Sequence, residues 1–275
     1  MVAIENRPGD DRAARYRAVV FHALERLSQG DDRSKTLHRL RTHLRRLQAY
    51  LELVGETSNA EVMADCVSRL SPLRTLHVFE RYLSRADAPR SDLRLVRKRI
   101  RKRLARLRRR QVYREIDRLV REHALPPTPT LAGWMAHRLA ELRQANMDGL
   151  RTLVQEAQAK PKRKRLHQLR LKIKSVRYQE EWALGRPGER PDMVGWLKHA
   201  QSVLGEYEER AQFRRLARKL ALKSVARVEK DWRQARKRAR VLPAHLAELL
   251  EGIARGRVRL LGSRSREGRR AVGFQ

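Results

Sequence analysis

Two histidines occupy matching places in a repeated sequence, and basic residues follow each of them at helical spacing. The segment Leu37-His38-Arg39-Leu40-Arg41 returns 129 residues later as Leu166-His167-Gln168-Leu169-Arg170. A neutral imidazole donates one hydrogen bond, and an arginine guanidinium offers a fork of donors that fits phosphate and carboxylate oxygens. These residue types therefore suit the binding of an anion. The offset is close to half the chain, which predicts two similar helical halves.

Helical geometry places the repeated charges on one side. At about 100° per residue, the positions three, seven, ten and fourteen after each histidine fall within a stripe about 80° wide, and leucines occupy the opposite side. A solvated surface would place acids four residues from bases, but no acid occurs between His38 and Gln48 or between Lys160 and Gln179. We therefore expect each stripe to bind a linear polyanion. The stripes hold His38, Arg41 and Arg45 in the first copy, and Lys160, Arg163, His167, Arg170, Lys174 and Arg177 in the second.

Helices are expected to build almost the whole chain, because sparse glycines and prolines separate long segments of apolar periodicity. The pattern predicts an all-α fold with halves at about 10–125 and 130–255, followed by a mobile basic tail at 256–275. The expected helices are about 10–29, 31–55, 57–70, 71–86, 91–124, 131–159, 160–184, 191–204, 206–240 with a break, and 243–255.

The expected helix at 91–124 has an unusual charge pattern. Leu93, Val96, Ile100, Leu104 and Leu107 form an apolar seam, while ten basic residues and no acid lie between Arg97 and Arg110. The seam indicates a packed helix with a charged exterior rather than a disordered tail. Lys98, Arg101 and other basic residues of this helix are expected to widen the positive field around the stripes.

The whole chain carries a formal net charge of +34, which calls for a polyanionic partner. Nucleic acid, an acidic membrane surface and polyphosphate all meet that demand, and charge alone does not choose among them. Cys66 is the only cysteine, so an internal disulfide framework is excluded. Since no apolar run is long enough for a membrane span or a secretory signal, we expect a cytoplasmic protein.

At the two histidine segments the sequence resembles the CHAD family, named for its conserved-histidine alpha-helical domain. The first family motif is met by His38, Arg41, Arg45 and Arg46, with Gln48 at a position that is usually basic. The second motif is met throughout, by His167, Arg170, Lys174, Arg177, Tyr178 and Glu181. The resemblance spans roughly residues 12–250. It implies two four-helix-type bundles related by pseudo-two-fold symmetry, and a central basic channel that takes up inorganic polyphosphate.

On this basis the expected function is polyphosphate binding, with association to polyphosphate granules, no cofactor and no catalysis. Arginines and Lys174 would neutralise phosphate oxygens, the two histidines would each donate a hydrogen bond, and Tyr178 would add a hydroxyl.

Two other classes of function remain open. A nucleic-acid-binding protein is less favoured, because single-strand binders stack bases on aromatics and the aromatic content is only 5%. A polyphosphate-processing enzyme would need a glycine-rich phosphate loop or metal-holding carboxylates, and the stripes contain neither. No HxxxH or HExxH spacing suggests a metal site. The sequence leaves the oligomeric state open.

Overall fold

The computed structural model describes residues 10–31, 33–123, 132–184 and 190–254, and these contain nine helices and no strand. The all-α prediction is confirmed, whereas the predicted tail at 256–275 lies outside the described residues. The helices are α1 (Asp10–Ser28), α2 (Ser34–Leu53), α3 (Thr57–Arg85), α4 (Arg90–Arg109), α5 (Val112–Glu122), α6 (Ala132–Ala159), α7 (Arg163–Ala183), α8 (Pro191–Lys219) and α9 (Val225–Ala254).

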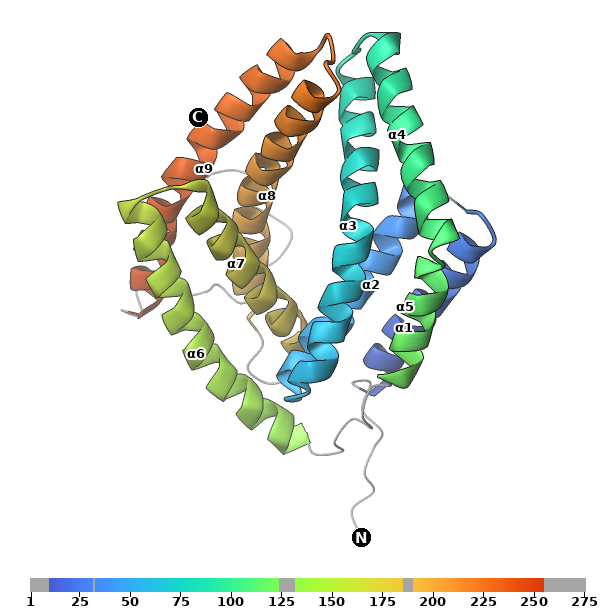
Figure 1. Cartoon of the computed structure of the whole chain (residues 1–275). Helices are drawn as coiled ribbons and strands as arrows, with labels where there is room; N and C mark the ends of the chain where they lie inside the picture. Colours follow the sequence, from blue (N-terminus) through green and yellow to red (C-terminus); the bar gives the residue numbers. More distant parts are fainter. Residues whose placement is uncertain (1–9, 32, 124–131, 185–189, 255–275) are drawn as a thin grey trace, which may run out of the picture.

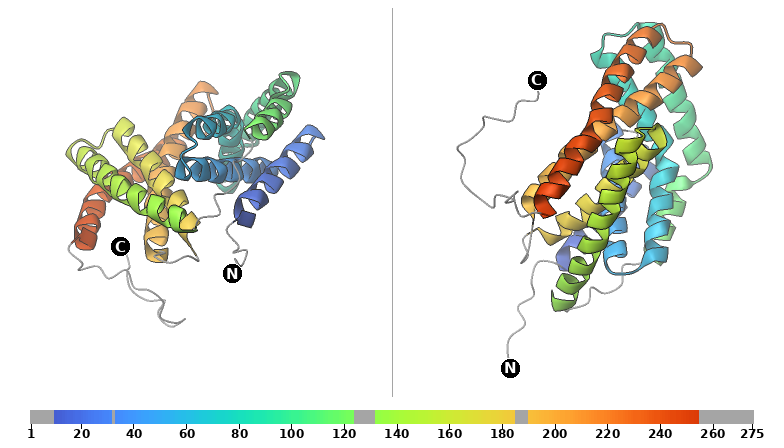
Figure 2. Two further views of the ribbon diagram at one scale, coloured as in Figure 1. Left: turned by 90° about the horizontal axis from the view of Figure 1, so that it is seen from below. Right: turned by 90° about the vertical axis from the view of Figure 1, so that its left-hand side faces the viewer.

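The helices form two groups, α1–α5 and α6–α9, which meet in the middle of the molecule, mainly where α2 contacts α7 and also where α3 contacts α8 (Figures 1 and 2). Each group surrounds a hydrophobic core. The first core is drawn mainly from α1–α5 but also includes Phe213 and Ala217 of α8, and the second is drawn from α6–α9. The two halves therefore share part of their packing rather than standing as separate bundles.

Two expected helix boundaries are wrong. The segments 57–70 and 71–86 form one helix, α3, with Pro72 inside it. Pro72 removes the amide that would bond to the Ser68 carbonyl, but both residues are exposed, so water can replace that donor. Conversely, the expected helix at 91–124 is divided into α4 and α5 at Gln111, whose φ of 49° is left-handed. The break turns α5 so that Ile116 and other apolar residues are buried in the first core.

The predictions for the C-terminal third also need correction. Residues 191–219 form one helix, and 225–254 form another that contains Pro243. The break that was expected within 206–240 therefore falls at residues 220–224. Lys160 was placed on the second basic helix, but α7 begins only at Arg163. A residue before proline is forced out of the helical region, so Pro161 separates Lys160 from that helix.

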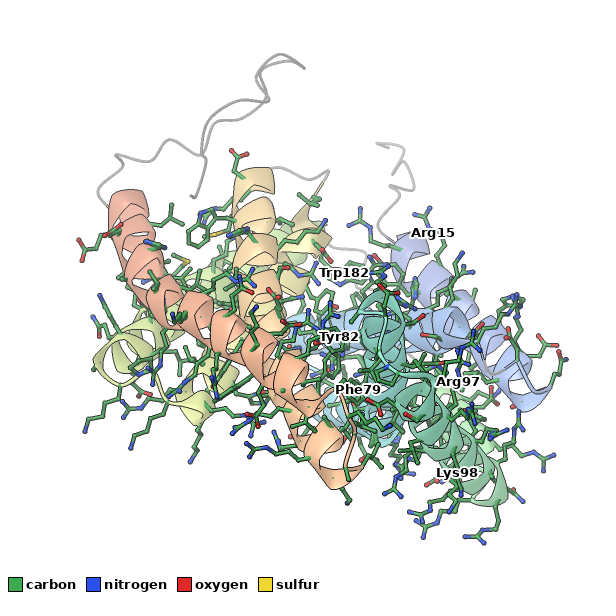
Figure 3. The ribbon with its side chains drawn as sticks, turned by 90° about the horizontal axis from the view of Figure 1, so that it is seen from above. Arg15, Phe79, Tyr82, Arg97, Lys98 and Trp182 are labelled. Atoms are coloured by element: carbon green, nitrogen blue, oxygen red, sulfur yellow. The ribbon has the colours of Figure 1, made fainter. Side chains whose placement is uncertain are left out.

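Aromatic packing and polar contacts join the halves at two levels. Phe79 of α3 stacks on Phe213 of α8 with ring centroids 4.8 Å apart, and Figure 3 shows Phe79 and Tyr82 between the two groups of helices. Where α2 meets α7, Oε2 of Glu52 accepts hydrogen bonds from Ser175 (3.2 Å) and Gln179 (3.4 Å). These contacts hold the two histidine-bearing helices in a fixed relation.

A buried carboxylate joins the two halves where α4 and α9 begin. Asp92 of α4 accepts hydrogen bonds from the backbone amides of Lys223 (3.1 Å) and Ser224 (2.9 Å) and from the Ser224 hydroxyl (2.7 Å). These donors immediately precede α9, so Asp92 caps a helix of the other half from a distance in sequence. Arg227 of α9 also donates a hydrogen bond to the Ala86 carbonyl, which lies between α3 and α4. Polar bonds therefore hold the start of α9 against the start of α4.

Candidate polyanion-binding site

Buried aliphatic rows determine which sides of α2 and α7 carry the charges. Because these rows pack in the cores, the histidine stripes are turned to the opposite side, where His38 is exposed and Arg41, Arg45, Arg170 and Lys174 are half-buried. The buried rows are Leu37, Leu40, Leu44 and Leu47 in α2, and Leu166, Leu169, Ile173 and Val176 in α7.

Four guanidinium groups from three helices gather where the stripes approach each other. We call Arg41 and Arg45 of α2, Arg74 of α3 and Arg170 of α7 the central cluster. Burial, followed by the charges of Arg45 and Arg74, lowers the pKa of Arg41 to about 10, and Arg170 acts in the same direction. Burial and Arg170 also lower the pKa of Arg45. The two halves therefore contribute cations to one repulsive cluster.

The central cluster has more donors than the described residues can satisfy. Arg41 donates one hydrogen bond to the Ser71 hydroxyl (3.1 Å), but its Nε is buried without a partner among the described residues, and so is the Nε of Arg170. Glu209 is an acid that interacts electrostatically with Arg74 and Arg170. A buried N–H without an acceptor costs about 1–3 kcal/mol. An anion placed here would supply acceptors and negative charge together.

Equivalent arginines have different neighbours in the two halves. Arg41 bonds to Ser71, whereas the corresponding Arg170 packs against Gly205, where an added Cβ would lie 3.8 Å from the arginine Nε. Arg170 therefore lacks the hydroxyl that holds Arg41. The two-fold relation between the halves stays a prediction.

The two histidines also have contrasting surroundings. Partial burial and the guanidinium groups of Arg74 and Arg41 lower the pKa of His38, which favours a neutral ring with a single N–H donor. His167 lies instead beside an acid, with its Nδ1 3.8 Å from Oε2 of Glu208. Burial alone would raise the pKa of Glu208, but hydrogen bonds from Arg163 and Gln212 lower it, so the carboxylate stays charged. The two histidines therefore match in sequence, but the charges around them differ.

The C-terminal end of the α7 stripe is closed by internal pairing. Arg177 is buried, where it forms an ion pair with Glu181 and donates to Oε1 of Gln201 (3.0 Å). Its guanidinium also lies 4.2 Å from the ring centroid of Tyr178, which is buried too. Lys174 approaches the same ring at 5.8 Å and remains half-buried. Arg177 and Tyr178 thus support the stripe from within, while Lys174 lies at its open side.

Three other predicted binding residues lie away from the central cluster. Arg46 is directed toward α1, with its guanidinium 5.1 Å from the ring centroid of Tyr16. Arg163 forms an ion pair with Glu208 at 2.6 Å. Lys160 and Arg163 line a separate hollow at the start of α7, together with Trp232, Arg236 and Arg240 of α9.

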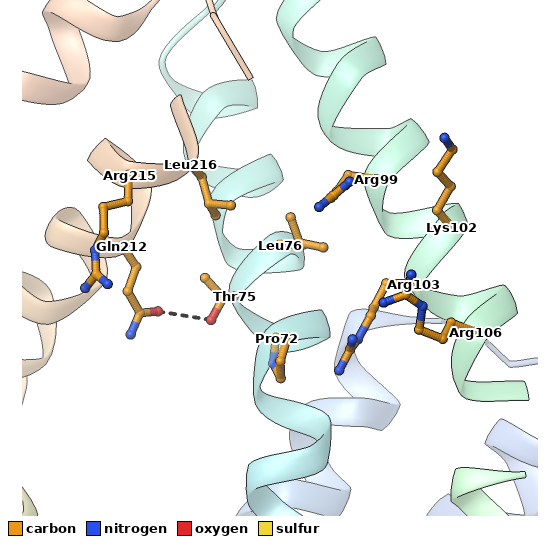
Figure 4. Close-up of a pocket in the computed structure, with 10 residues that line it drawn as sticks. All are labelled: Pro72, Thr75, Leu76, Arg99, Lys102, Arg103, Arg106, Gln212, Arg215 and Leu216. Atoms are coloured by element: carbon orange, nitrogen blue, oxygen red, sulfur yellow. Dashed lines mark hydrogen bonds between the residues drawn. The ribbon is translucent and has the colours of Figure 1, made fainter. Parts of the chain in front are cut away.

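A basic hollow that the sequence did not indicate lies between α3, α4 and α8 (Figure 4). Its volume is about 390 Å³, and we call it the α4 hollow. Its cations are Arg99, Lys102, Arg103 and Arg106 of α4 and Arg215 of α8. The four cations of α4 share one flank of that helix beside the apolar seam, but the sequence could not tell which flank would face α8. The predicted residues Lys98 and Arg101 line a different hollow, with Arg94, Arg97 and Glu80.

A chain of hydrogen bonds links the α4 hollow to the second histidine. Thr75, which lines the hollow, donates to Oε1 of Gln212 (3.0 Å), as Figure 4 shows. Gln212 in turn donates to Glu208 (3.2 Å), the acid beside His167. Polar side chains therefore connect one wall of the α4 hollow to the residues around His167.

Two further findings concern the described residues alone. They contain no group of three or more histidine, cysteine or acidic side chains that could hold a metal ion. None of their helices combines the length and apolar character needed to cross a membrane.

Comparisons with known proteins agree with the architecture. The family described as CHAD domain matches residues 12–218. The crystal structure of the CHAD domain from the plant Ricinus communis is similar to this chain, with a TM-score of 0.51 and 19% sequence identity. The match covers 89% of this chain and 90% of that one, and at this identity it shows the fold alone. Among curated proteins, no sequence matches.

Proposed function

The chain belongs to the CHAD domain family, and from that premise we propose that it binds inorganic polyphosphate through the central cluster. Family membership supports a polyphosphate-related role. We extend the proposal to association with polyphosphate granules in the cytoplasm, and to binding without turnover.

The observation that carries this proposal is the set of unsatisfied donors in the central cluster. The Nε atoms of Arg41 and Arg170 are buried without an acceptor among the described residues, within a group of four guanidiniums. Polyphosphate offers about one charge per phosphate and many acceptor oxygens, with no bases to be read. It therefore satisfies both requirements of the cluster, and arginine forks suit phosphate geometry.

The polymer path follows from which end of the stripe is open. Arg177 is already paired with Glu181 and Gln201, so the C-terminal end of α7 offers few free donors. The His167 end adjoins the α4 hollow and its cations. We therefore route the polymer through Arg41, Arg45, Arg170 and Lys174 and then across α8 toward α4.

The test is a titration of the protein with polyphosphates of graded length at several salt concentrations. For a polyphosphate that contacts only Arg41, Arg45, Arg170 and Lys174, four phosphate contacts at about −0.7 each, by analogy with single-stranded nucleic acids, give a log-log salt slope of about −3. Replacing Arg45 and Arg170 by glutamine should roughly halve that slope and weaken binding at least tenfold. The matched control replaces the exposed Arg39 and Lys198 by glutamine, which removes the same charge outside the cluster.

An equal loss of affinity in both double variants would contradict the central cluster as the site. Preference for DNA or RNA over polyphosphate of equal charge would favour a nucleic-acid-binding function instead. Release of phosphate upon incubation with magnesium would show that the protein is an enzyme.

A further inference from the structure

Helix α4 presents three sides, and the polymer path uses only one of them. The buried side holds Val96, Ile100, Leu104 and Leu107. Taking Lys98 as zero and about 100° per residue, these residues centre near about 190°, and the cations of the α4 hollow lie between about 40° and 140°. The remaining side, from about 280° to 360°, carries what we call the α4 row. The α4 row consists of Arg90, Arg94, Lys98 and Arg101.

The α4 row is exposed and has no partner. All four side chains are exposed, and none forms a hydrogen bond or an ion pair with another described residue. Two acids lie near the α4 row, and each already has another partner. Glu80 forms an ion pair with Arg97 at 2.7 Å, and Asp92 is buried and accepts hydrogen bonds from the residues before α9. Lys98 lies on α4 at the edge of the molecule in Figure 3.

The neighbouring helix shows what an ordinary solvated surface of this protein looks like. On α5, Arg118 pairs with Glu122 and Arg121 pairs with Asp117, each at 2.7 Å and four residues apart. Such pairing relieves repulsion along a helix. Nothing equivalent relieves the α4 row, which extends about 16 Å along the axis at 1.5 Å per residue. A straight series of unpaired cations complements a linear polyanion.

We propose that the α4 row is a second polyphosphate-binding surface, so that one protein molecule bridges two polymer strands and condenses polyphosphate. This inference rests on the proposed function of the central cluster. The row and the α4 hollow lie on different sides of one helix, so a strand held by the row is separate from the strand held in the hollow. Two sites on one protein and many on each polymer generate a network. Excess polymer disperses that network, because each polymer then carries too few bridges.

The experiment compares two triple variants with the wild-type protein. The row variant carries Arg94→Gln, Lys98→Gln and Arg101→Gln. The control variant carries Lys198→Gln, Lys219→Gln and Lys230→Gln, which removes three exposed charges from α8 and α9. Circular dichroism checks that each variant is folded. Affinity is measured with polyphosphate too short to reach both sites, and condensation is measured as light scattering across a titration with long polyphosphate.

We expect wild-type protein and the control variant to scatter strongly near charge balance and to clear at excess polymer. The row variant should bind fewer equivalents of short polyphosphate, with an affinity at the remaining site within about threefold of wild type, and should scatter at least fivefold less. Scattering by the row variant equal to that of the control would overturn the bridging role. A row variant that still condenses polyphosphate but loses binding to duplex DNA or phosphatidylserine vesicles would assign the row to that other anion.

The two proposals fail in different ways. If wild-type protein binds short and long polyphosphate but never scatters, the bridging inference is wrong and the binding function stands. If wild-type protein binds neither polymer, the proposed function itself is wrong.

Discussion

Replacing Arg41 by glutamine should leave the free protein as stable as before or more stable, while weakening polyphosphate binding. Arg41 is held among Arg45, Arg74 and Arg170, and burial with these charges lowers its pKa from the ordinary arginine value to about 10. At 1.36 kcal/mol per pKa unit, this environment disfavours the charged form by about 3 kcal/mol. Glutamine removes the charge, while loss of the bond to Ser71 costs about 1 kcal/mol.

The net expectation is a gain of up to about 2 kcal/mol in the free energy of unfolding, or several degrees in Tm at about 2–4 °C per kcal/mol. With polyphosphate present, the wild-type protein should become the more stable of the two. A ligand at one hundred times its Kd stabilises the folded state by about 2.7 kcal/mol, so the weaker-binding variant gains less from the same concentration.

The assay is thermal unfolding of wild type, Arg41→Gln and Arg39→Gln, with and without polyphosphate. Arg39 is an exposed neighbour on α2 and serves as the control, because removing its charge should change neither quantity strongly. A variant at Arg41 that unfolds several degrees earlier than wild type without ligand, yet binds polyphosphate equally well, would refute the reasoning. Arg41 would then be a structural residue.

Two further predictions concern the scaffold. Burial alone would raise the pKa of Asp92, but hydrogen bonds from the Ser224 hydroxyl and amide and from the Lys223 amide lower it. A carboxyl with a lowered folded pKa adds stability above its unfolded pKa and loses it as pH falls. Asp92→Ala should therefore cost about 2–4 kcal/mol at pH 7, and the difference from wild type in urea unfolding should shrink below about pH 4. A constant difference down to pH 2 would contradict this cap. Arg177→Gln should lower the urea midpoint through loss of its pairing with Glu181, while the salt slope of polyphosphate binding changes by less than 0.7, the approximate value for one phosphate contact. A slope change of one full contact would instead make Arg177 a direct ligand.

The helix faces could be predicted because each is set by neighbouring residues on one element. The leucines of α2 and the aliphatic row of α7 determine where His38, Arg41, His167 and Arg170 lie, and all of these follow from helical periodicity. The left-handed turn at Gln111 was missed, because glutamine has no special preference for that conformation.

Partners on other helices could not be predicted. Arg177 fits the family pattern, and Glu181 lies four residues further along α7, but its other partner, Gln201, comes from α8. Arg99 and Lys98 are adjacent in sequence, yet only Arg99 lines the α4 hollow, since the packing of α4 against α3 and α8 selects the flank. Sequence periodicity predicts which residues share a face of a helix, but the packing of the helices determines which other residues that face contacts.

The sharing of Phe213 and Ala217 by the first core has a consequence for biosynthesis. That core also takes in Trp182, Leu222 and Val228, all of which are made long after α1–α5 have left the ribosome. The nascent N-terminal half therefore carries an open apolar surface until translation has passed residue 228. Folding of the two halves is coupled to a late stage of synthesis, and a chain that stops at the midpoint of the sequence would expose surface suited to aggregation.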